Sequence, residues 1–277
     1  MSYIIHSFYQ FFDFPRFRDW KSPLLSSMQQ HAVLGTLLLA PEGINGTVSG
    51  TDGGLSILHQ LLQTIPQLAP LEIKISHHES LPFGTAKVKL KDELISLGEP
   101  AHPQHQVGRY VSPQDWNALI SDPEVIVIDA RNSYEAHLGS FSGAINPQTR
   151  KFSQLPAATR ARTSPQQHRK IASFCTGGIR CEKYTAWLLA EGYDEVYHLQ
   201  GGILNYLETI PPELSLWQGS CYVFDERVAV GHGLQPDNSI TTCPACGHPL
   251  TTQDRAHAEY VADVSCPHCA HYPPSNA

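Results

Sequence analysis

The chain has 277 residues, of which 41% are apolar and 16% charged, and its formal net charge is −7. Length suggests about two domains with room for a small third one, and the apolar content excludes a wholly disordered chain. No run approaches the roughly eighteen apolar residues of a membrane span, and the first residues lack the basic region of a secretory signal. We therefore expect a soluble, cytoplasmic protein with no membrane partner. The acidic total by itself argues against nucleic acid as a partner, because phosphate binding needs Lys and Arg.

The first hundred residues are typical of an α+β domain. Apolar or alternating stretches predict strands, and apolar residues at helical spacing predict the helices between them. The expected strands are 4–11, 33–40, 44–49, 71–76 and 87–97, and the expected helices are 15–30 and 55–65. The order βαββαβ indicates a ferredoxin-like, acylphosphatase-like sandwich over residues 1–100.

A second domain is expected over residues 112–215, after a linker at 101–111 that is rich in Pro and His. Ser112 and Pro113 form a typical helix start. Short apolar runs that alternate with helical patterns predict an α/β domain with a largely parallel sheet. The expected strands are 125–129, 171–174 and 196–199, and the main helix is 179–191. Residues 216–277 form a Cys-rich and His-rich C-terminal region.

The segment SFCTGGIRCEK, residues 173–183, carries the strongest chemical signal. A strand runs into Cys175 and a helix follows, so that loop N–H groups and the helix N-terminus converge on the sulfur. This placement lowers a thiol pKa, and Arg180 adds a fixed positive charge. The loop between these two residues consists of Thr176, Gly177, Gly178 and Ile179. The alternative is a buried structural cysteine before a tight turn.

The length of this loop distinguishes phosphate chemistry from persulfide chemistry. Cysteine phosphatases use C-x5-R, whereas Cys175 and Arg180 are spaced as C-x4-R. The smaller cradle suits a persulfide better than a phosphate. Cys181, six residues after Cys175, is either a resolving thiol that attacks a persulfide or sulfenate, or a side chain packed under the loop.

Four cysteines near the C-terminus have the spacing of a zinc ribbon. Two CxxC pairs are separated by 19 residues, and four thiolates in a tetrahedron around Zn²⁺ would form a closed, structural site. The expected ligands are Cys243, Cys246, Cys266 and Cys269. The alternatives are two redox-active pairs, or a His ligand taken from His248, His268 or His271.

The stretch CTGGIR, together with IVIDAR at 126–131 and LQGGI at 199–203, resembles a rhodanese domain, in which the loop cysteine carries a persulfide. Three stretches more narrowly resemble the rhodanese-related tRNA uridine hydroxylases. They are LAPEGINGTVSG at 39–50, CTGGIRCEK at 175–183 and GSCYVFDERVAV at 219–230. The resemblance implies that Cys175 is the active-site cysteine and that Arg180 closes its loop. It also implies that Asp129 and Arg131, at the end of a strand, support the active site.

The resemblance also implies a reaction. The family makes 5-hydroxyuridine at the wobble position of certain tRNAs in an oxygen-dependent reaction, so we expect an oxidoreductase with O₂ as co-substrate. The thiolate would add to C6 of uracil, or a persulfide or sulfenate would deliver the oxygen. No NAD, flavin or haem motif is visible, nor a convincing non-haem iron triad, and no motif identifies the electron donor. The resemblance supports a metal at the C-terminal cysteines.

Two further sets of residues are candidates for the substrate. Within PEGING, positions 41–46, Glu42 and Asn45 either belong to an ordinary turn or face the substrate base. Residues 147–184 hold eight basic residues and one acidic residue, while the rest of the chain has a net charge of −14. A local basic patch for one anticodon loop is therefore compatible with the acidic total. Its candidates are Arg160, Arg162, Arg169, Lys170 and Lys183.

Two other functions compete with tRNA hydroxylation. A plain thiosulfate or persulfide sulfurtransferase would need only the chemistry at Cys175, but it leaves the two flanking regions unexplained. A non-catalytic zinc-ribbon binding module would have no use for a thiolate cradle closed by Arg180.

Overall fold

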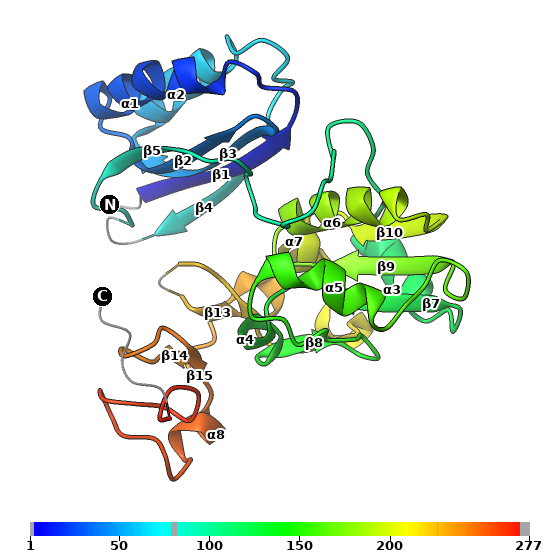
Figure 1. Cartoon of the computed structure of the whole chain (residues 1–277). Helices are drawn as coiled ribbons and strands as arrows, with labels where there is room; N and C mark the ends of the chain where they lie inside the picture. Colours follow the sequence, from blue (N-terminus) through cyan, green and yellow to red (C-terminus); the bar gives the residue numbers. More distant parts are fainter. Residues whose placement is uncertain (1–2, 79–81, 226, 272–277) are drawn as a thin grey trace. The chain divides into compact units, whose positions relative to one another are not determined.

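The computed structural model describes residues 3–78, 82–225 and 227–271 (Figure 1). The chain divides into two compact units. The first unit comprises Met1–Ser96 and His102–Gln106, and the second comprises Leu97–Ala101 and Val107–Ala277. Within the described residues, no helix is long and apolar enough to cross a membrane.

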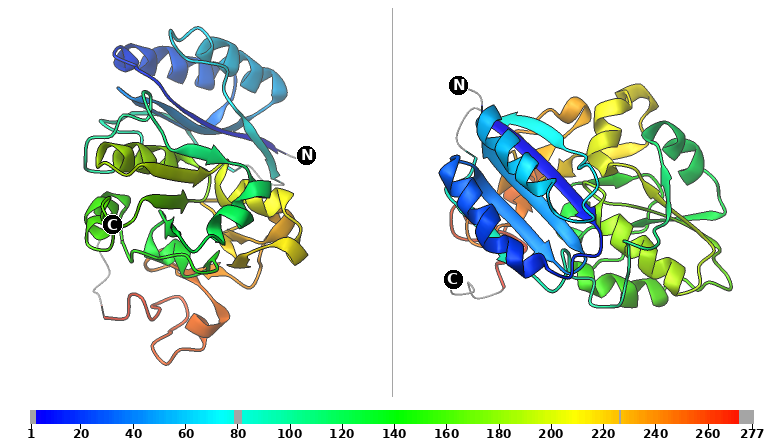
Figure 2. Two further views of the ribbon diagram at one scale, coloured as in Figure 1. Left: turned by 90° about the vertical axis from the view of Figure 1, so that its right-hand side faces the viewer. Right: turned by 90° about the horizontal axis from the view of Figure 1, so that it is seen from above.

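The first unit is a five-stranded sheet with two helices on one face (Figure 2). The sheet order is β4-β1-β3-β2-β5, antiparallel throughout except for the parallel pair of β2 and β5. Its elements are β1 (Tyr3–Phe11), a 3-10 turn (Phe17–Trp20), α1 (Lys21–Gln30), β2 (Leu34–Ala40), β3 (Gly43–Gly50), α2 (Asp52–Leu62), β4 (Lys74–His78) and β5 (Ala86–Leu90). The ferredoxin-like order predicted from the sequence is confirmed, with β5 added at the edge.

The core of the first unit lies where the helices meet the sheet. Apolar residues recur at helical spacing in α1 and α2, and this face packs on the inward side chains of the strands. The buried residues include Phe8, Leu24, Met28, Leu37, Ile44, Val48, Leu55 and Leu58.

The predicted end of the last strand in the first unit was wrong. The strand expected over 87–97 ends at Leu90, and beyond it the backbone N–H of Leu94 donates to the Glu42 carboxylate at 2.7 Å. The strand expected over 44–49 is confirmed as β3, which begins one residue earlier, at Gly43, after a turn at 41–42. Gly43 has φ 143°, and a Cβ there would lie 2.0 Å from the carbonyl oxygen of Gln10. Only glycine therefore allows β3 to pair with β1 at this point.

The second unit is built on a four-stranded parallel sheet of order β6-β10-β9-β7. This sheet confirms the predicted rhodanese-type α/β architecture. Its elements are β6 (Arg109–Val111), α3 (Pro113–Ile120), β7 (Val125–Asp129), α4 (Ser133–Ala136), β8 (Gly139–Phe141), a 3-10 turn (Phe152–Gln154), α5 (Leu155–Arg160), β9 (Lys170–Phe174), α6 (Ile179–Ala190), β10 (Glu195–Leu199), α7 (Gly202–Thr209) and a 3-10 turn (Pro212–Leu214). As expected, the Ser112 side chain caps α3 by accepting the N–H of Asp115 at 3.2 Å.

The segment predicted as a linker is not wholly irregular. Arg109–Val111 pair with Tyr197–Leu199 as β6, the edge strand of the second sheet. These three residues precede the helix cap directly, so the chain reaches the sheet before α3 begins. The linker interpretation of 101–111 is therefore corrected at its last three residues.

The C-terminal region is made of small two-stranded pieces. They are β11 (Trp217–Gly219), which pairs with β8; β12 (Cys221–Tyr222) with β13 (Ala229–Val230); a 3-10 turn (His232–Leu234); β14 (Thr241–Thr242) with β15 (Pro249–Leu250); and α8 (Thr252–Arg255). The rhodanese core does not end at residue 215, because Trp217, Cys221 and Val230 are buried in one cluster with Phe141 and Phe174. Trp217, Cys221, Val223 and Val230 therefore complete the core of the second unit.

Candidate functional site

Cys175 directly follows β9, at the edge where the carboxyl ends of two parallel strands meet. β7 pairs with β9, and Asp129, the last residue of β7, lies opposite Phe174. Parallel strands end at a common edge, so the register brings Asp129 next to the start of the cysteine loop. α6 then begins at Ile179, which points its N-terminus at the same edge.

The loop wraps around the sulfur of Cys175. The N–H of Gly178 donates to Sγ at 3.2 Å, and Gly178 has φ 108°, a conformation that favours glycine. Ile203 N–H donates to the carbonyl of Cys175 at 2.9 Å. A Cβ on Gly202 would lie 2.6 Å from that carbonyl oxygen and 2.5 Å from that of Thr176. The glycines of LQGGI therefore let α7 approach and fix the backbone of the cysteine loop.

A buried ion pair holds Arg180. Its guanidinium makes two hydrogen bonds to the Glu135 carboxylate, at 2.5 and 2.6 Å, and a third at 3.3 Å to the hydroxyl of Thr176. The side chains of Arg180 and Glu135 are 7% and 0% exposed. Burial by itself raises the pKa of Glu135, but Arg180 and then Arg131 outweigh it and hold this pKa below the ordinary value. Glu135 is therefore an anion inside the protein.

A second buried ion pair adjoins the first. Arg131 binds both carboxylate oxygens of Asp129, at 2.9 and 2.6 Å, and both side chains are fully buried. The same guanidinium donates to the carbonyl oxygens of Gly139 at 2.7 Å and of Glu135 at 3.4 Å. Asp129 and Arg131 thus position the end of α4 that carries Glu135, and they act on the loop through it.

This environment favours the thiolate of Cys175. Burial by itself raises its pKa, but the hydrogen bond from Cys181, the charge of Arg180 and the N–H groups of Cys181 and Gly178 lower it to about 6. Burial, and then the hydrogen bond to Cys175 and its charge, raise the pKa of Cys181 well above the ordinary value. Cys181 is therefore the proton donor to a Cys175 thiolate in this structure. Its role as a resolving thiol stays a prediction.

Glu135 is a residue of the site that was not predicted from the sequence. A local signal was present, because Asn132 and Glu135 have the spacing of a capping box and the Glu135 carboxylate accepts the N–H of Asn132 at 3.1 Å. That signal predicts a helix start and gives no hint of the pairing with Arg180.

The basic segment is not a free positive patch. Three of its five candidate RNA contacts form ion pairs with acidic residues of the second unit. The pairs are Arg160 with Glu99 and Glu191, Arg169 with Asp194, and Lys170 with Asp122 and Glu124. Lys183 is only 1% exposed, and Arg162 is exposed and donates to the carbonyl of Ala158 at 3.0 Å. The predicted excess of surface charge is therefore mostly compensated by residues distant in sequence.

Glu42 and Asn45 belong to the first unit. Glu42 uses its carboxylate to bind the backbone of Leu94 in that unit, and Asn45 lies inside β3, where it pairs with Tyr9 and Leu38. These contacts give both residues a structural role. A substrate-facing role for them stays a prediction.

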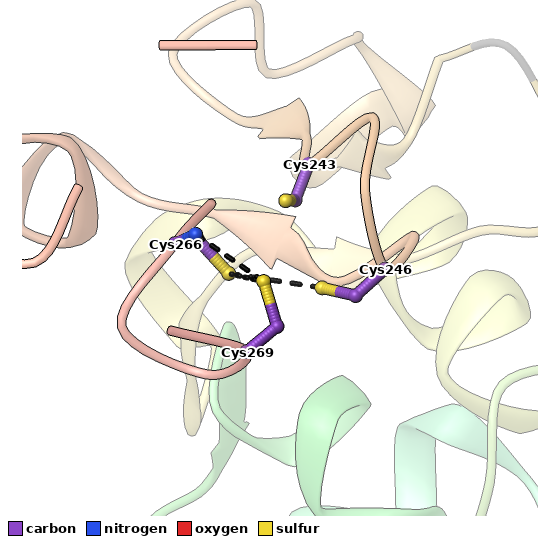
Figure 3. Close-up of side chains that lie close together, drawn as sticks. All are labelled: Cys243, Cys246, Cys266 and Cys269. Carbon is purple, nitrogen blue, oxygen red and sulfur yellow. Dashed lines mark hydrogen bonds between the residues drawn. The ribbon is translucent and has the colours of Figure 1, made fainter. Parts of the chain in front are cut away.

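The four C-terminal cysteines converge (Figure 3). All four sulfur atoms lie within 4.8 Å of one another, and the Cys246–Cys266 and Cys266–Cys269 separations are both 3.7 Å. A tetrahedron with metal–sulfur bonds of about 2.3 Å has edges of about 3.8 Å. The cluster therefore fits a metal ion such as zinc. The imidazoles of His268 and His271 pair with acidic residues, Asp254 and Glu259, at 3.0 and 2.6 Å.

We expect the Cys175 thiol to ionise with a midpoint near pH 6, because Cys181, Arg180 and the loop N–H groups outweigh its burial. The thiolate fraction then rises as the pH rises through this value. Ultraviolet thiolate absorbance, measured against pH for the wild type minus Cys175→Ser, checks this expectation. A midpoint at the ordinary thiol value of about 8.5 would show that the loop does not activate the cysteine.

Glu135→Gln should destabilise the second unit strongly, because it leaves the buried Arg180 without its carboxylate. Breaking a buried ion pair on one side costs about 3–5 kcal/mol. The matched control is Glu191→Gln, which removes a partner of Arg160 at the surface and should cost about 1 kcal/mol or less. Urea unfolding followed by circular dichroism measures both changes, and equal losses for the two variants would contradict the assignment.

Comparisons with known proteins cover both units. The model of the UPF0176 acylphosphatase-like domain matches residues 3–94, and that of the rhodanese-like domain matches residues 112–209. Solved structures match single parts of the chain at low similarity. A rhodanese-related protein from Thermoplasma volcanium is 22% identical, with a TM-score of 0.30, over 37% of this chain and 95% of that one. An acylphosphatase from Coxiella burnetii is 11% identical, with a TM-score of 0.25, over 32% and 93%.

A curated relative matches nearly the whole chain. The tRNA uridine(34) hydroxylase of Picosynechococcus sp. is 47% identical over 268 residues, which cover 96% of this chain and 90% of that protein. This match of 268 residues spans both units. The chain therefore belongs to the tRNA uridine(34) hydroxylase family.

Proposed function

We propose that this protein hydroxylates C5 of the wobble uridine, position 34, of tRNA in an oxygen-dependent reaction that uses Cys175. The observation that carries the substrate assignment is the 47% identity to a tRNA uridine(34) hydroxylase over 96% of the chain. The activated cysteine supports the chemistry, because its lowered pKa makes it a nucleophile near neutral pH.

In the proposed reaction the Cys175 thiolate adds to C6 of uracil. The electron pair of the C5–C6 bond moves toward O4, which makes C5 electron-rich. C5 then takes up an oxygen atom derived from O₂, and loss of the C5 proton expels the thiolate. The second oxygen atom of O₂ leaves as water, which requires two electrons and two protons from an external donor. The competing route uses the same cysteine: O₂, with two electrons and two protons from the external donor, first oxidises the Cys175 sulfur or its persulfide and releases water, and the oxidised sulfur then delivers its oxygen atom to C5.

The residues around Cys175 have separate tasks in this proposal. Arg180 stabilises the thiolate before addition and after expulsion, and Glu135 fixes the position of Arg180. The hydroxyl of Thr176 joins both groups, at 3.3 Å from each. Zn²⁺ at the four-cysteine cluster would have a structural role, because four thiolates leave no coordination position open.

A sulfurtransferase remains the second candidate, favoured by one observation: the C-x4-R loop around a low-pKa cysteine is sufficient for persulfide transfer. The two candidates differ in their substrate, so one set of variants separates them.

The test measures modified wobble nucleosides in tRNA by mass spectrometry, in a strain that lacks the gene. We expect the wild-type protein to restore the 5-hydroxyuridine-derived nucleosides and Cys175→Ser to leave them at background. Cys221→Ser, a substitution of a buried cysteine of the core, is the matched control and should retain activity. Restoration by Cys175→Ser would contradict the proposed nucleophile. Unchanged nucleosides with the wild type, together with strong thiosulfate:cyanide activity, would favour the sulfurtransferase.

A further inference from the structure

Three side chains that can ligate a metal lie together outside the cysteine loop and the four-cysteine cluster. They are His137, Asp254 and His268, and one ligand atom from each lies within 4.8 Å of the other two. His137 follows α4, Asp254 lies in α8, and His268 lies in the second CxxC pair. Three segments distant in sequence therefore bring two imidazoles and one carboxylate to one point of the second unit.

The distances between these atoms fit metal coordination. Nε2 of His268 lies 3.0 Å from Oδ1 of Asp254, and Nε2 of His137 lies 3.5 Å from Oδ2. A divalent metal at about 2.1 Å from nitrogen and oxygen ligands holds neighbouring ligand atoms about 3.0 Å apart at octahedral angles and about 3.4 Å apart at tetrahedral angles. Both imidazoles also present the same nitrogen, Nε2, to the carboxylate.

Surrounding residues hold the carboxylate and one imidazole in place. Oδ2 of Asp254 accepts hydrogen bonds from the backbone N–H and the hydroxyl of Thr251, at 2.8 and 2.6 Å. Metal-binding carboxylates are commonly oriented by such outer partners. The His248 ring stacks on His268 with centroids 3.7 Å apart, and its own Nε2 is buried and has no hydrogen-bond partner among the described residues.

The site is open on one side. The side chain of His137 is 46% exposed and that of His268 is 29% exposed, whereas Asp254 is 11% exposed. Water or another small ligand can therefore complete the coordination of a bound ion. This openness distinguishes the cluster from the four cysteines, which form a closed set of soft ligands.

We propose that His137, Asp254 and His268 bind a divalent first-row transition-metal ion, separate from the ion of the four-cysteine cluster. Two imidazoles and one carboxylate with open positions form the donor set of non-haem Fe(II) sites, and the set also accepts Co(II) and Zn(II). This proposal does not depend on the proposed tRNA hydroxylation, because metal binding can be measured without tRNA.

The position of this site connects it to the cysteine loop. His137 lies two residues after Glu135, whose carboxylate binds Arg180. An ion bound to His137 would fix the C-terminal end of the short helix α4, whose N-terminal end is held by the capping box. The three ligands belong to the rhodanese fold and to the C-terminal region, so the ion would also link these two parts of the second unit.

The test titrates Co²⁺ into the full-length protein after one equivalent of Zn²⁺ has filled the cysteine cluster. Co²⁺ bound by thiolates gives an intense sulfur-to-metal charge-transfer band, whereas Co²⁺ bound by imidazole and carboxylate does not. We expect one equivalent of Co²⁺ to bind without this band. His137→Gln and His268→Gln should each weaken its binding by at least about tenfold, because loss of an outer-sphere partner alone costs that much.

The matched control is His257→Gln, which removes an exposed imidazole of the same region that pairs with Glu259 and not with Asp254. This variant should bind Co²⁺ as the wild type does. His268 lies between two zinc-ligating candidates, so His137→Gln decides the outcome if His268→Gln also releases zinc. The proposal is wrong if no Co²⁺ binds beyond the cysteine cluster, or if His137→Gln binds it unchanged while retaining its zinc.

Discussion

The buried ion pair between Arg180 and Glu135 is the interaction on which the cysteine site depends. A guanidinium taken out of water is costly unless a carboxylate in good geometry compensates it. Glu135 accepts two hydrogen bonds from Arg180. The neighbouring pair of Arg131 and Asp129 adds one more positive and one more negative charge. The pair therefore offsets the cost of burying the Arg180 charge beside Cys175.

The fold supplies this arrangement through the edge of its parallel sheet. β7 delivers Asp129 and Arg131, and β9 delivers Cys175, because adjacent parallel strands end together. The short helix α4 then places Glu135 under the loop, and the glycines at 201–202 let α7 close against it. Each of these features constrains the backbone around one sulfur atom, so the activation of Cys175 is a property of the whole strand edge.

Local patterns in the sequence were sufficient to predict the ferredoxin-like order, the parallel sheet, the strand–loop–helix at Cys175 and the grouping of four cysteines. Partners distant in the chain were not predictable. Glu135 lies 45 positions before Arg180, and Glu99 lies 61 positions before Arg160. The sequence suggested a positive docking patch at 147–184 because the acidic residues that pair with this segment lie in other parts of the chain. The cluster of His137, Asp254 and His268 was not predictable either, because its ligands come from three separate segments and sequence spacing does not show that they meet.

The central claim is that the charge of Arg180, held by Glu135, adds to the hydrogen bond from Cys181 and to the loop N–H groups in lowering the pKa of Cys175. The most direct test is the thiolate titration of the double variant Glu135→Gln/Arg180→Met, which removes both buried charges and keeps a side-chain oxygen for the helix cap. Replacing a buried ion pair by neutral groups is often close to neutral for stability, so this variant should fold. The account predicts that the pKa of Cys175 rises by about one unit or more. A folded double variant whose midpoint stays near pH 6 would contradict the claim and assign the thiolate to Cys181 and the loop N–H groups alone.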